Sequence, residues 1–195
     1  MPSGKDLPVV SARPSFDEIF MDICHLVARR TTCPRRGVGA VIAKEKHVLT
    51  TGYNGAPKDF PHPTETGCIR ERLEIPSGEL TDVCPCLHAE QNAILQAALF
   101  GISVKDSTLY CTTQPCTQCA RMIVNAGIRD VVFEVEYRDP LSIGLLTTGG
   151  VRLHQWDAAT KKAAPYARTN TWAQAQAAFE KDYVAKARAG QAVTR

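Results

Sequence analysis

The chain has 195 residues, 44% of them hydrophobic and 22% charged, and its 23 Lys and Arg against 20 Asp and Glu give a formal net charge of +3. These proportions are typical of a globular domain and exclude wholesale disorder, and the small charge gives no argument for a nucleic-acid partner. No stretch approaches the ~20 apolar residues of a membrane span, and the first residues lack the apolar stretch of a signal peptide. We therefore expect a cytoplasmic protein whose eight cysteines are mostly thiols or metal ligands.

The first quarter of the chain predicts an arm, a helix and a hairpin. Residues 1–14, which contain three prolines, are expected to form a loose arm. Ser15 begins a capping box ahead of apolar residues at helical spacing, and this pattern predicts a helix over residues 16–30. Two β-rich runs, 38–43 and 47–53, are separated by a short charged turn and predict a β-hairpin.

Periodicity is lost over residues 54–87, which contain five prolines. An irregular segment of that length in a small domain usually has a function or holds a metal. Beyond it, helical and strand patterns alternate. They predict helices over 89–100 and 115–126, strands over 107–112, 131–135 and 151–153, and a tail helix over 170–188.

This order of elements predicts an α/β fold with three layers, helix-sheet-helix, around a mixed five-stranded sheet. We expect a catalytic domain over residues 15–154 that contains the irregular insertion 54–87. A helical C-terminal extension over residues 155–195 would follow it. The sequence shows no internal repeat, which favours one domain over a repeat array.

Two short motifs, each at the start of a predicted helix, carry the chemistry. His88 and Glu90 begin one helix, and Cys116 and Cys119 lie three residues apart at the start of the next. Cysteines at this spacing share one side of a helical turn, and a helix N-terminus favours thiolates. With His88 as a third ligand, a tetrahedral zinc ion keeps one position for water, as in catalytic zinc sites. Glu90 would face this water and transfer its proton.

Each motif alone has an ordinary alternative, since Cys-x-x-Cys also occurs in structural zinc sites and redox pairs. Together they form the pattern His-x-Glu…Pro-Cys-x-x-Cys, which is typical of zinc nucleobase deaminases. Here the chain resembles the cytidine and deoxycytidylate deaminase superfamily, and more narrowly the deoxycytidylate (dCMP) deaminases of bacterial and viral type. The resemblance extends over about residues 15–154, and its matching segments are Val38–Ile42, Gly52–Pro57, His88–Ile94 and Pro115–Ala120.

The resemblance implies a cytidine-deaminase-like fold and the zinc-dependent hydrolysis of dCMP to dUMP and ammonia, which supplies dUMP for thymidylate synthesis. It also implies zinc on His88, Cys116 and Cys119, with Glu90 as the proton shuttle. The residue chemistry described above agrees with these roles.

The resemblance further implies how a nucleotide would be held. The backbone of Ala89 would contact the base and Asn54 the sugar, although Asn-Gly is equally a hairpin-turn signal. Arg30 and Tyr137 fall where the family holds the phosphate, and both side chains are good phosphate donors. The alternative for Arg30 is an interaction with the end of its own helix. Further residues expected to line or rim the opening of the same nucleotide site are Arg35, Arg36, Lys58 and Arg138.

The remaining cysteines divide into two groups. Some dCMP deaminases have a second, structural zinc in such an insertion, and four ligands would close a tetrahedral site. The set favoured for it is Cys33, His62, Cys68 and Cys84, with Cys86 as a substitute. The alternative is free thiols in a loop held by packing. Cys24 and Cys111 lie in apolar patterns and are expected to be buried packing residues.

Family resemblance also implies a homo-oligomer, commonly a hexamer, with dCTP and dTTP as effectors and Mg²⁺ accompanying them. Two further hypotheses compete with a dCMP deaminase. One is a deaminase acting on another cytosine nucleotide or nucleoside, or on a tRNA adenosine. The other is a zinc-stapled nucleic-acid-binding module, which leaves Glu90 without a role and lacks a basic stripe. We expect a small nucleotide substrate, with neither a nucleic-acid strand nor a membrane as partner.

Overall fold

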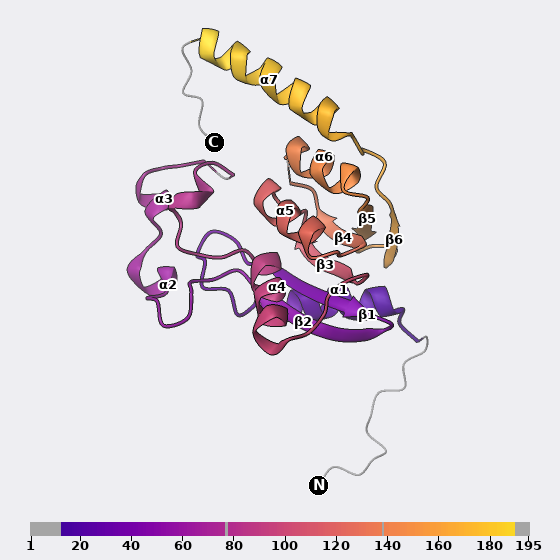
Figure 1. Ribbon diagram of the computed structural model, residues 1–195. Helices are drawn as coiled ribbons and strands as arrows, with labels where there is room; N and C mark the ends of the chain where they lie inside the picture. The colour runs from indigo at the N-terminus through magenta and orange to yellow at the C-terminus, as the bar shows by residue number, and fades with distance from the viewer. Residues whose placement is uncertain (1–12, 77, 138, 190–195) are drawn as a thin grey trace.

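The computed structural model describes residues 13–76, 78–137 and 139–189, so the expected arm at 1–14 lies almost wholly outside the described residues. The helices are α1 (Phe16–Ala28), α2 (Pro63–Thr66), α3 (Ile69–Arg72), α4 (Ala89–Phe100), α5 (Thr117–Asn125), α6 (Pro140–Thr148) and α7 (Trp172–Arg188) (Figure 1). The strands are β1 (Gly39–Lys44), β2 (His47–Tyr53), β3 (Thr108–Thr113), β4 (Asp130–Val135), β5 (Arg152–Asp157) and β6 (Lys162–Pro165). Within the described residues, no helix is long and apolar enough to cross a bilayer.

The six strands form one mixed sheet in the order β2-β1-β3-β4-β5-β6. Strands β3, β4 and β5 are parallel, and the other neighbours are antiparallel. The predicted three-layer α/β fold is confirmed, but the prediction of five strands is wrong. The sixth, β6, has the sequence Lys-Ala-Ala-Pro, which lacks both β-branched residues and alternation. It is an edge strand that forms against β5, so the sheet continues beyond residue 154.

Helix α6 is a second element that the sequence prediction lacks, although Asp139 and Pro140 at its start are typical of a helix N-terminus. Asp139 caps it by accepting a hydrogen bond from the backbone N–H of Ser142 at 3.1 Å. Gly144 lies where α7 crosses, and a Cβ on it would stand 2.7 Å from the Cβ of Ala175. Helix α7 therefore packs closely on α6, and Figure 1 shows it extending from there along the outside of the molecule.

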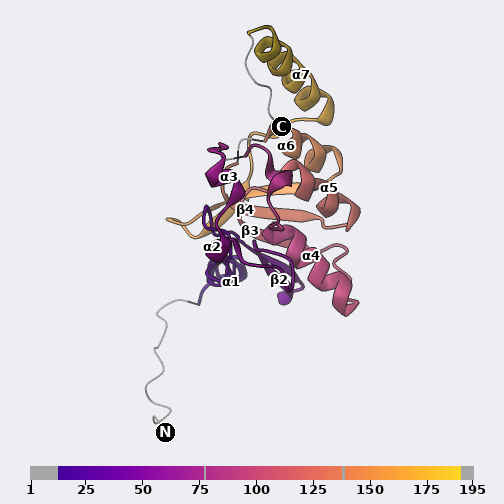
Figure 2. The ribbon, with the colours of Figure 1, turned by 90° about the vertical axis from the view of Figure 1, so that its left-hand side faces the viewer.

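Side chains along the strands alternate between two buried layers. Val41 packs in the layer that contains α1, whereas Ile42 packs in the layer that contains α4, α5 and α6. Figure 2 shows α1 on one side of the sheet and these three helices on the other. Cys24 and Cys111 are fully buried, one in each layer, as expected for packing residues.

Two glycines let helices approach the hairpin closely. A Cβ on Gly39 would lie 1.9 Å from the carbonyl oxygen of Cys24 in α1. A Cβ on Gly52 would lie 2.1 Å from the carbonyl oxygen of Ala89 in the first turn of α4. A larger residue at either position would displace a helix, so Gly52 fixes the distance between β2 and the start of α4.

The insertion over 54–87 is mostly irregular, as expected. Its regular structure consists of α2, α3 and a 3₁₀ turn at Thr81–Val83, and residue 77 lies outside the described part of the chain. The backbones of Gly55 and Leu87 exchange two hydrogen bonds of 3.1 and 2.9 Å, which close the insertion at its base. The insertion therefore begins and ends beside the N-terminus of α4, where the first motif lies.

Candidate active site

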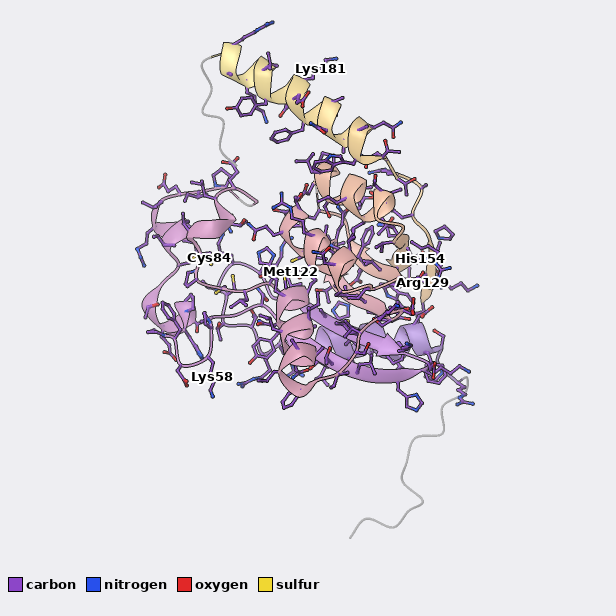
Figure 3. The ribbon with its side chains drawn as sticks, in the orientation of Figure 1. Lys58, Cys84, Met122, Arg129, His154 and Lys181 are labelled. Atoms are coloured by element: carbon purple, nitrogen blue, oxygen red, sulfur yellow. The ribbon has the colours of Figure 1, made fainter. Side chains whose placement is uncertain are left out.

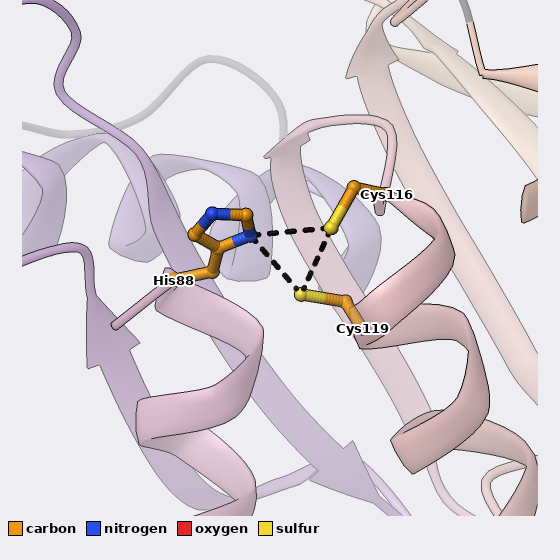
Figure 4. Close-up of side chains that lie close together, drawn as sticks. All are labelled: His88, Cys116 and Cys119. Atoms are coloured by element: carbon orange, nitrogen blue, oxygen red, sulfur yellow. Dashed lines mark hydrogen bonds between the residues drawn. The ribbon is translucent and has the colours of Figure 1, made fainter. Parts of the chain in front are cut away.

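The two sequence motifs meet at the N-termini of neighbouring helices. His88 is the N-cap of α4, Cys116 is the N-cap of α5, and Cys119 follows in the first turn of α5. The Nδ1 atom of His88 lies 3.3 Å from Sγ of Cys116 and 3.4 Å from Sγ of Cys119. The two sulfur atoms are 3.7 Å apart, and Figure 4 shows the three side chains converging. One ion can contact all three donors at once.

The charge states of these groups favour a bound cation. Hydrogen bonding to Cys119 and His88 lowers the pKa of Cys116 to about 4, and Cys116 in turn raises the pKa of His88 to about 9. The pKa of Cys119 is raised because it shares its proton with Cys116 and is buried. The Cys116 thiolate is therefore stabilised by the protons on His88 and Cys119. A bound zinc ion would displace these protons and supply the positive charge instead. A set of two sulfurs and one imidazole suits zinc and leaves a fourth position for another ligand.

Glu90 is buried in the first turn of α4, beside the same group. Its side chain is 4% exposed, and burial is the main cause that raises its pKa above the usual value. Its carboxyl group interacts with the Cys119 thiol, so it lies at the edge of the metal centre. A carboxyl group with a raised pKa can both accept and return a proton, as general acid–base catalysis requires.

A cavity of about 350 Å³ opens over the metal centre. This volume is within the range of small-molecule sites. Four of the residues predicted from the sequence to bind substrate or to act in catalysis line it: Asn54, Ala89, Glu90 and Tyr137. Residues from the segment after β2, from α4 and from the loop after β4 therefore surround one space that borders the candidate metal ligands.

Asn54 lines this cavity, and its side chain is hydrogen-bonded to neighbouring segments of the chain. Its Oδ1 accepts hydrogen bonds from the hydroxyl of Thr31 at 2.9 Å and the backbone N–H of Val38 at 2.8 Å. Its Nδ2 donates to the carbonyl of Arg36 at 2.8 Å. Asn54 is not part of a tight hairpin turn, because β2 ends at Tyr53 and the chain enters the insertion. These bonds hold the segment after α1 against the cavity.

The basic residues of the cavity agree only in part with those expected. Arg35 and Arg36 line it as expected, whereas Arg30 is exposed and does not. Lys58 is exposed on the insertion, as Figure 3 shows, and Arg138 lies outside the described residues. Arg70 of α3 lines the cavity and has no signal in the sequence, since it belongs to no motif and lies in the irregular insertion.

Four cysteines also line the cavity on the side of the insertion: Cys33, Cys68, Cys84 and Cys86. Burial, followed by the neighbouring Cys84, Cys33 and Cys68, raises the pKa of Cys86 to about 12. His62 is different, because it is exposed and its nearest charged partner is Glu65 at 3.9 Å. The structure therefore groups the cysteines of the favoured second metal set but leaves its histidine outside, and it adds Cys86.

Comparisons with known proteins agree with this geometry. The chain is 39% identical over 145 residues to the deoxycytidylate deaminase of Schizosaccharomyces pombe, covering 74% of this chain but only 45% of that protein. It is 37% identical to ComE operon protein 2 of Bacillus subtilis, covering 73% of this chain and 72% of that protein. The crystal structure of the dCMP deaminase from the cyanophage S-TIM5 in complex with dCMP and dUMP superposes with a TM-score of 0.59. That protein is 32% identical to this one, and the match covers 74% of this chain and 98% of that one.

The family model described as the cytidine and deoxycytidylate deaminase zinc-binding region matches residues 14–135. This match contains the hairpin, the insertion and both motifs, and therefore all three candidate metal ligands. The chain belongs to the cytidine and deoxycytidylate deaminase family.

Proposed function

We propose that the protein is a zinc-dependent hydrolase that converts dCMP to dUMP and ammonia. The observation that carries this proposal is the convergence of His88, Cys116 and Cys119 beside the buried carboxyl group of Glu90, at the base of a nucleotide-sized cavity. The names of the relatives support the same substrate, because the S. pombe protein is a deoxycytidylate deaminase and the phage structure holds dCMP and dUMP.

The site residues would share the reaction between them. His88, Cys116 and Cys119 would hold a zinc ion, which would supply the Lewis acidity needed to activate a water at C4 of the cytosine ring. Glu90 would take one proton from that water and deliver it to N3 of the ring. It would then carry the second proton, from the new C4 hydroxyl, to the amino group, so that the C4–N bond breaks, ammonia leaves and the C4 carbonyl forms. Its burial raises its pKa and excludes bulk water that would otherwise exchange the proton. The backbone of Ala89 would orient the base.

Glu90→Gln tests the proton transfer. The variant keeps the shape of the side chain but cannot cycle a proton, so we expect normal zinc content and a loss of about 10²- to 10⁴-fold in kcat. Ammonia release from dCMP measures the turnover, and metal analysis measures the zinc. Near-normal turnover in this variant would overturn the role of Glu90. A panel that includes cytidine, other cytosine nucleotides and a tRNA adenosine substrate separates dCMP deamination from the alternatives.

The phosphate group of the substrate would lie among the arginines of the cavity wall. Nη1 of Arg35 and Nε of Arg70 are buried without a hydrogen-bond partner within the described part of the chain. Buried guanidinium donors are almost always paired, so these two atoms point to an anionic group that binds there. Tyr137 lines the same cavity and offers its hydroxyl, as expected from the sequence. Arg35 and Arg70 would therefore take the role that the sequence assigned to Arg30.

Arg70→Gln tests this assignment. We expect a rise in KM for dCMP of about 10- to 100-fold, the value of a hydrogen bond to a charged group, with little change for deoxycytidine, which has no phosphate. Arg72→Gln is the matched control, since Arg72 lies in the same helix but does not line the cavity. Equal turnover of deoxycytidine and dCMP by the wild type would contradict a phosphate site.

We also propose a second, structural zinc held by Cys33, Cys68, Cys84 and Cys86. The four thiols border one wall of the cavity, and the insertion that carries three of them has little regular structure to order it. A tetrahedral four-cysteine site would cross-link the segment after α1 to the insertion and so fix Arg70 in the wall.

A homo-oligomer is proposed as the assembly. Leu99 is 79% exposed and Phe100 67% exposed at the end of α4, with Leu95 one turn earlier, and such apolar patches usually contact a partner. Light scattering of the purified protein measures the number of subunits, for which a hexamer is the prediction. Regulation by dCTP or dTTP with Mg²⁺ stays a prediction from the family resemblance, and adding these nucleotides to the deamination assay tests it.

A further inference from the structure

Asp139, in the loop between β4 and α6, contacts the helix that carries the two metal-binding cysteines. One carboxylate oxygen accepts a hydrogen bond from the backbone N–H of Thr117 at 2.7 Å, and both oxygens lie 2.8 Å from the Thr117 hydroxyl. The same carboxylate accepts from the backbone N–H of Ser142, which makes Asp139 the N-cap of α6. A single side chain therefore caps its own helix and holds the first residue of α5.

The start of α5 needs such a partner because of its sequence. The N-cap of a helix is usually Ser, Thr, Asp or Asn, whose oxygen accepts from a free backbone N–H of the first turn. In α5 the N-cap is Cys116, which makes no side-chain cap, because its sulfur faces His88 and Cys119. The carboxylate of Asp139 satisfies one free N–H group of this first turn, that of Thr117, while the Cys116 sulfur stays directed at His88 and Cys119.

Further hydrogen bonds join this loop and the start of α6 to the segment around the cysteine motif. The hydroxyl of Ser142, which is fully buried, donates to the carbonyl of Pro115 at 2.5 Å. The backbone N–H of Gln114 donates to the carbonyl of Val135 at 2.8 Å, and the side-chain oxygen of Gln114 accepts from the backbone N–H of Tyr137 at 3.4 Å. The loops after β3 and after β4 are therefore joined along their length, between the metal ligands and Tyr137.

We propose that Asp139 is a positioning residue that orients Cys116 and Cys119 towards the metal and, two residues away, Tyr137 towards the substrate. We call the hydrogen bonds of Asp139 with Thr117 and of Ser142 with Pro115 the clasp. The carboxylate does this through the backbone and hydroxyl of Thr117, which lies between the two cysteines in the sequence. Partners of this kind around metal ligands restrict their orientation and slow loss of the metal. The proposal depends on the proposed metal centre but not on the identity of the substrate.

The test measures zinc release from the zinc-loaded protein to a coloured chelator, alongside kcat and KM for dCMP. We expect Asp139→Ala to speed zinc release about 10- to 100-fold, to lower kcat and to raise KM. Asp139→Asn should have a smaller effect, because its amide oxygen can still cap α6 while its NH₂ group cannot accept from the Thr117 N–H. Measurements well below the unfolding temperature separate this effect from a general loss of stability.

Asp157→Ala is the matched control. Asp157 accepts from the backbone N–H of Ala159 at 2.8 Å and from the hydroxyl of Thr160 at 2.9 Å, in the turn between β5 and β6, so it makes similar bonds away from the cavity. Zinc release and kinetics should be unchanged in this control. Unchanged zinc release in Asp139→Ala, or equal acceleration in both variants, overturns the proposal. If Asp139→Ala does not fold, Ser142→Ala removes one bond of the clasp and should speed zinc release more than the control does.

Discussion

The molecule contains two groups of sulfur side chains that border one cavity but are built differently. Cys116 and Cys119 lie at the start of α5, and with His88 they already stand within reach of a single ion. The cysteines of the other group come from the segment after α1 and from the insertion: Cys33, Cys68, Cys84 and Cys86. Among the described residues, only the first group has its donor atoms close enough together to meet one ion.

The difference shows what backbone structure contributes to a metal site. A helix turn fixes the spacing of Cys116 and Cys119, and the contact of α4 with β2 at Gly52 fixes His88. The cysteines of the insertion have only short helices and turns behind them, so a metal would itself supply much of the order in that region. We therefore expect removal of metal from the first group to stop catalysis, and removal from the second to loosen the insertion.

The largest expected effect comes from Cys116→Ser. Loss of one of three ligands should remove the catalytic zinc, and because a bound metal contributes several kcal/mol to the transition state, we expect kcat to fall about 1,000-fold or more. Circular dichroism should remain close to that of the wild type, since the core on which α4 and α5 pack is apolar. A variant that keeps both its zinc and its turnover would show that the two clusters have been assigned the wrong roles.

A smaller effect on turnover is expected from Cys84→Ser in the second group. The wild type should contain two zinc ions per chain and this variant one, with faster proteolysis within 54–87 and a rise in KM for dCMP, because Arg70 lies in the same insertion. Metal analysis measures the zinc content, limited proteolysis the order of the insertion, and steady-state kinetics the KM. His62→Ala is the matched control and should keep both ions, since His62 is exposed. One zinc in the wild type, or loss of one in the control, would contradict the four-cysteine set.

The smallest effect is expected at the other end of the sheet, away from both clusters. The Nε and Nη2 atoms of Arg152 each lie 2.7 Å from a carboxylate oxygen of Asp130, and Nε2 of His154 lies 3.2 Å from Oδ1 of the same carboxylate. Figure 3 shows His154 far from Cys84 of the second cysteine group. Arg152, and then His154, hold the pKa of Asp130 below its usual value. A lowered folded-state pKa stabilises the protein above the unfolded value of about 3.9, and this stability is lost as the pH falls through the folded-state pKa.

Asp130→Asn should therefore lower the free energy of unfolding at pH 7 by about 1 kcal/mol or less, because the pair is partly exposed. The difference from the wild type should be smaller at about pH 3 than at pH 7, because the stability is lost as the pH falls from the unfolded value of about 3.9 through the lowered folded-state pKa. Urea unfolding at both pH values measures it, and kcat should not change. A difference that grows towards low pH would contradict the assignment, and an effect on kcat would show that this end of the sheet is coupled to the site.

Most of the fold and the centre of the site could be predicted from local patterns. The helix at Ala89–Phe100 has the predicted bounds, and the hairpin strands and the three parallel strands lie within a few residues of theirs. Strand β6 could not be predicted, because it depends on the open edge of β5. Helix α6 is absent from the sequence prediction although Asp139 and Pro140 mark its start, and only its packing against α7 at Gly144 needed the tertiary structure. The motif residues could be recognised because residues three apart in the sequence lie on the same side of a helical turn, so their spacing alone predicts that they are neighbours.

The arginines of the cavity wall could not all be predicted from local patterns. The phosphate was assigned to Arg30 at the end of a predicted helix, but Arg30 is exposed in the structure. Arg70, forty residues later in a segment without periodicity, lines the cavity instead. In the second cysteine group, the predicted ligand His62 is exposed, whereas Cys86, the predicted substitute, lines the cavity with the other three cysteines.

Sequence alone predicted the candidate metal ligands and Glu90 as one group, since each lies at the N-cap or in the first turn of a helix whose geometry is local. The partners of Cys33, the arginines of the wall and the clasp at Asp139 join segments that are distant in the chain. Only the tertiary structure could decide these, because loops are positioned by the contacts they make and not by their own propensities.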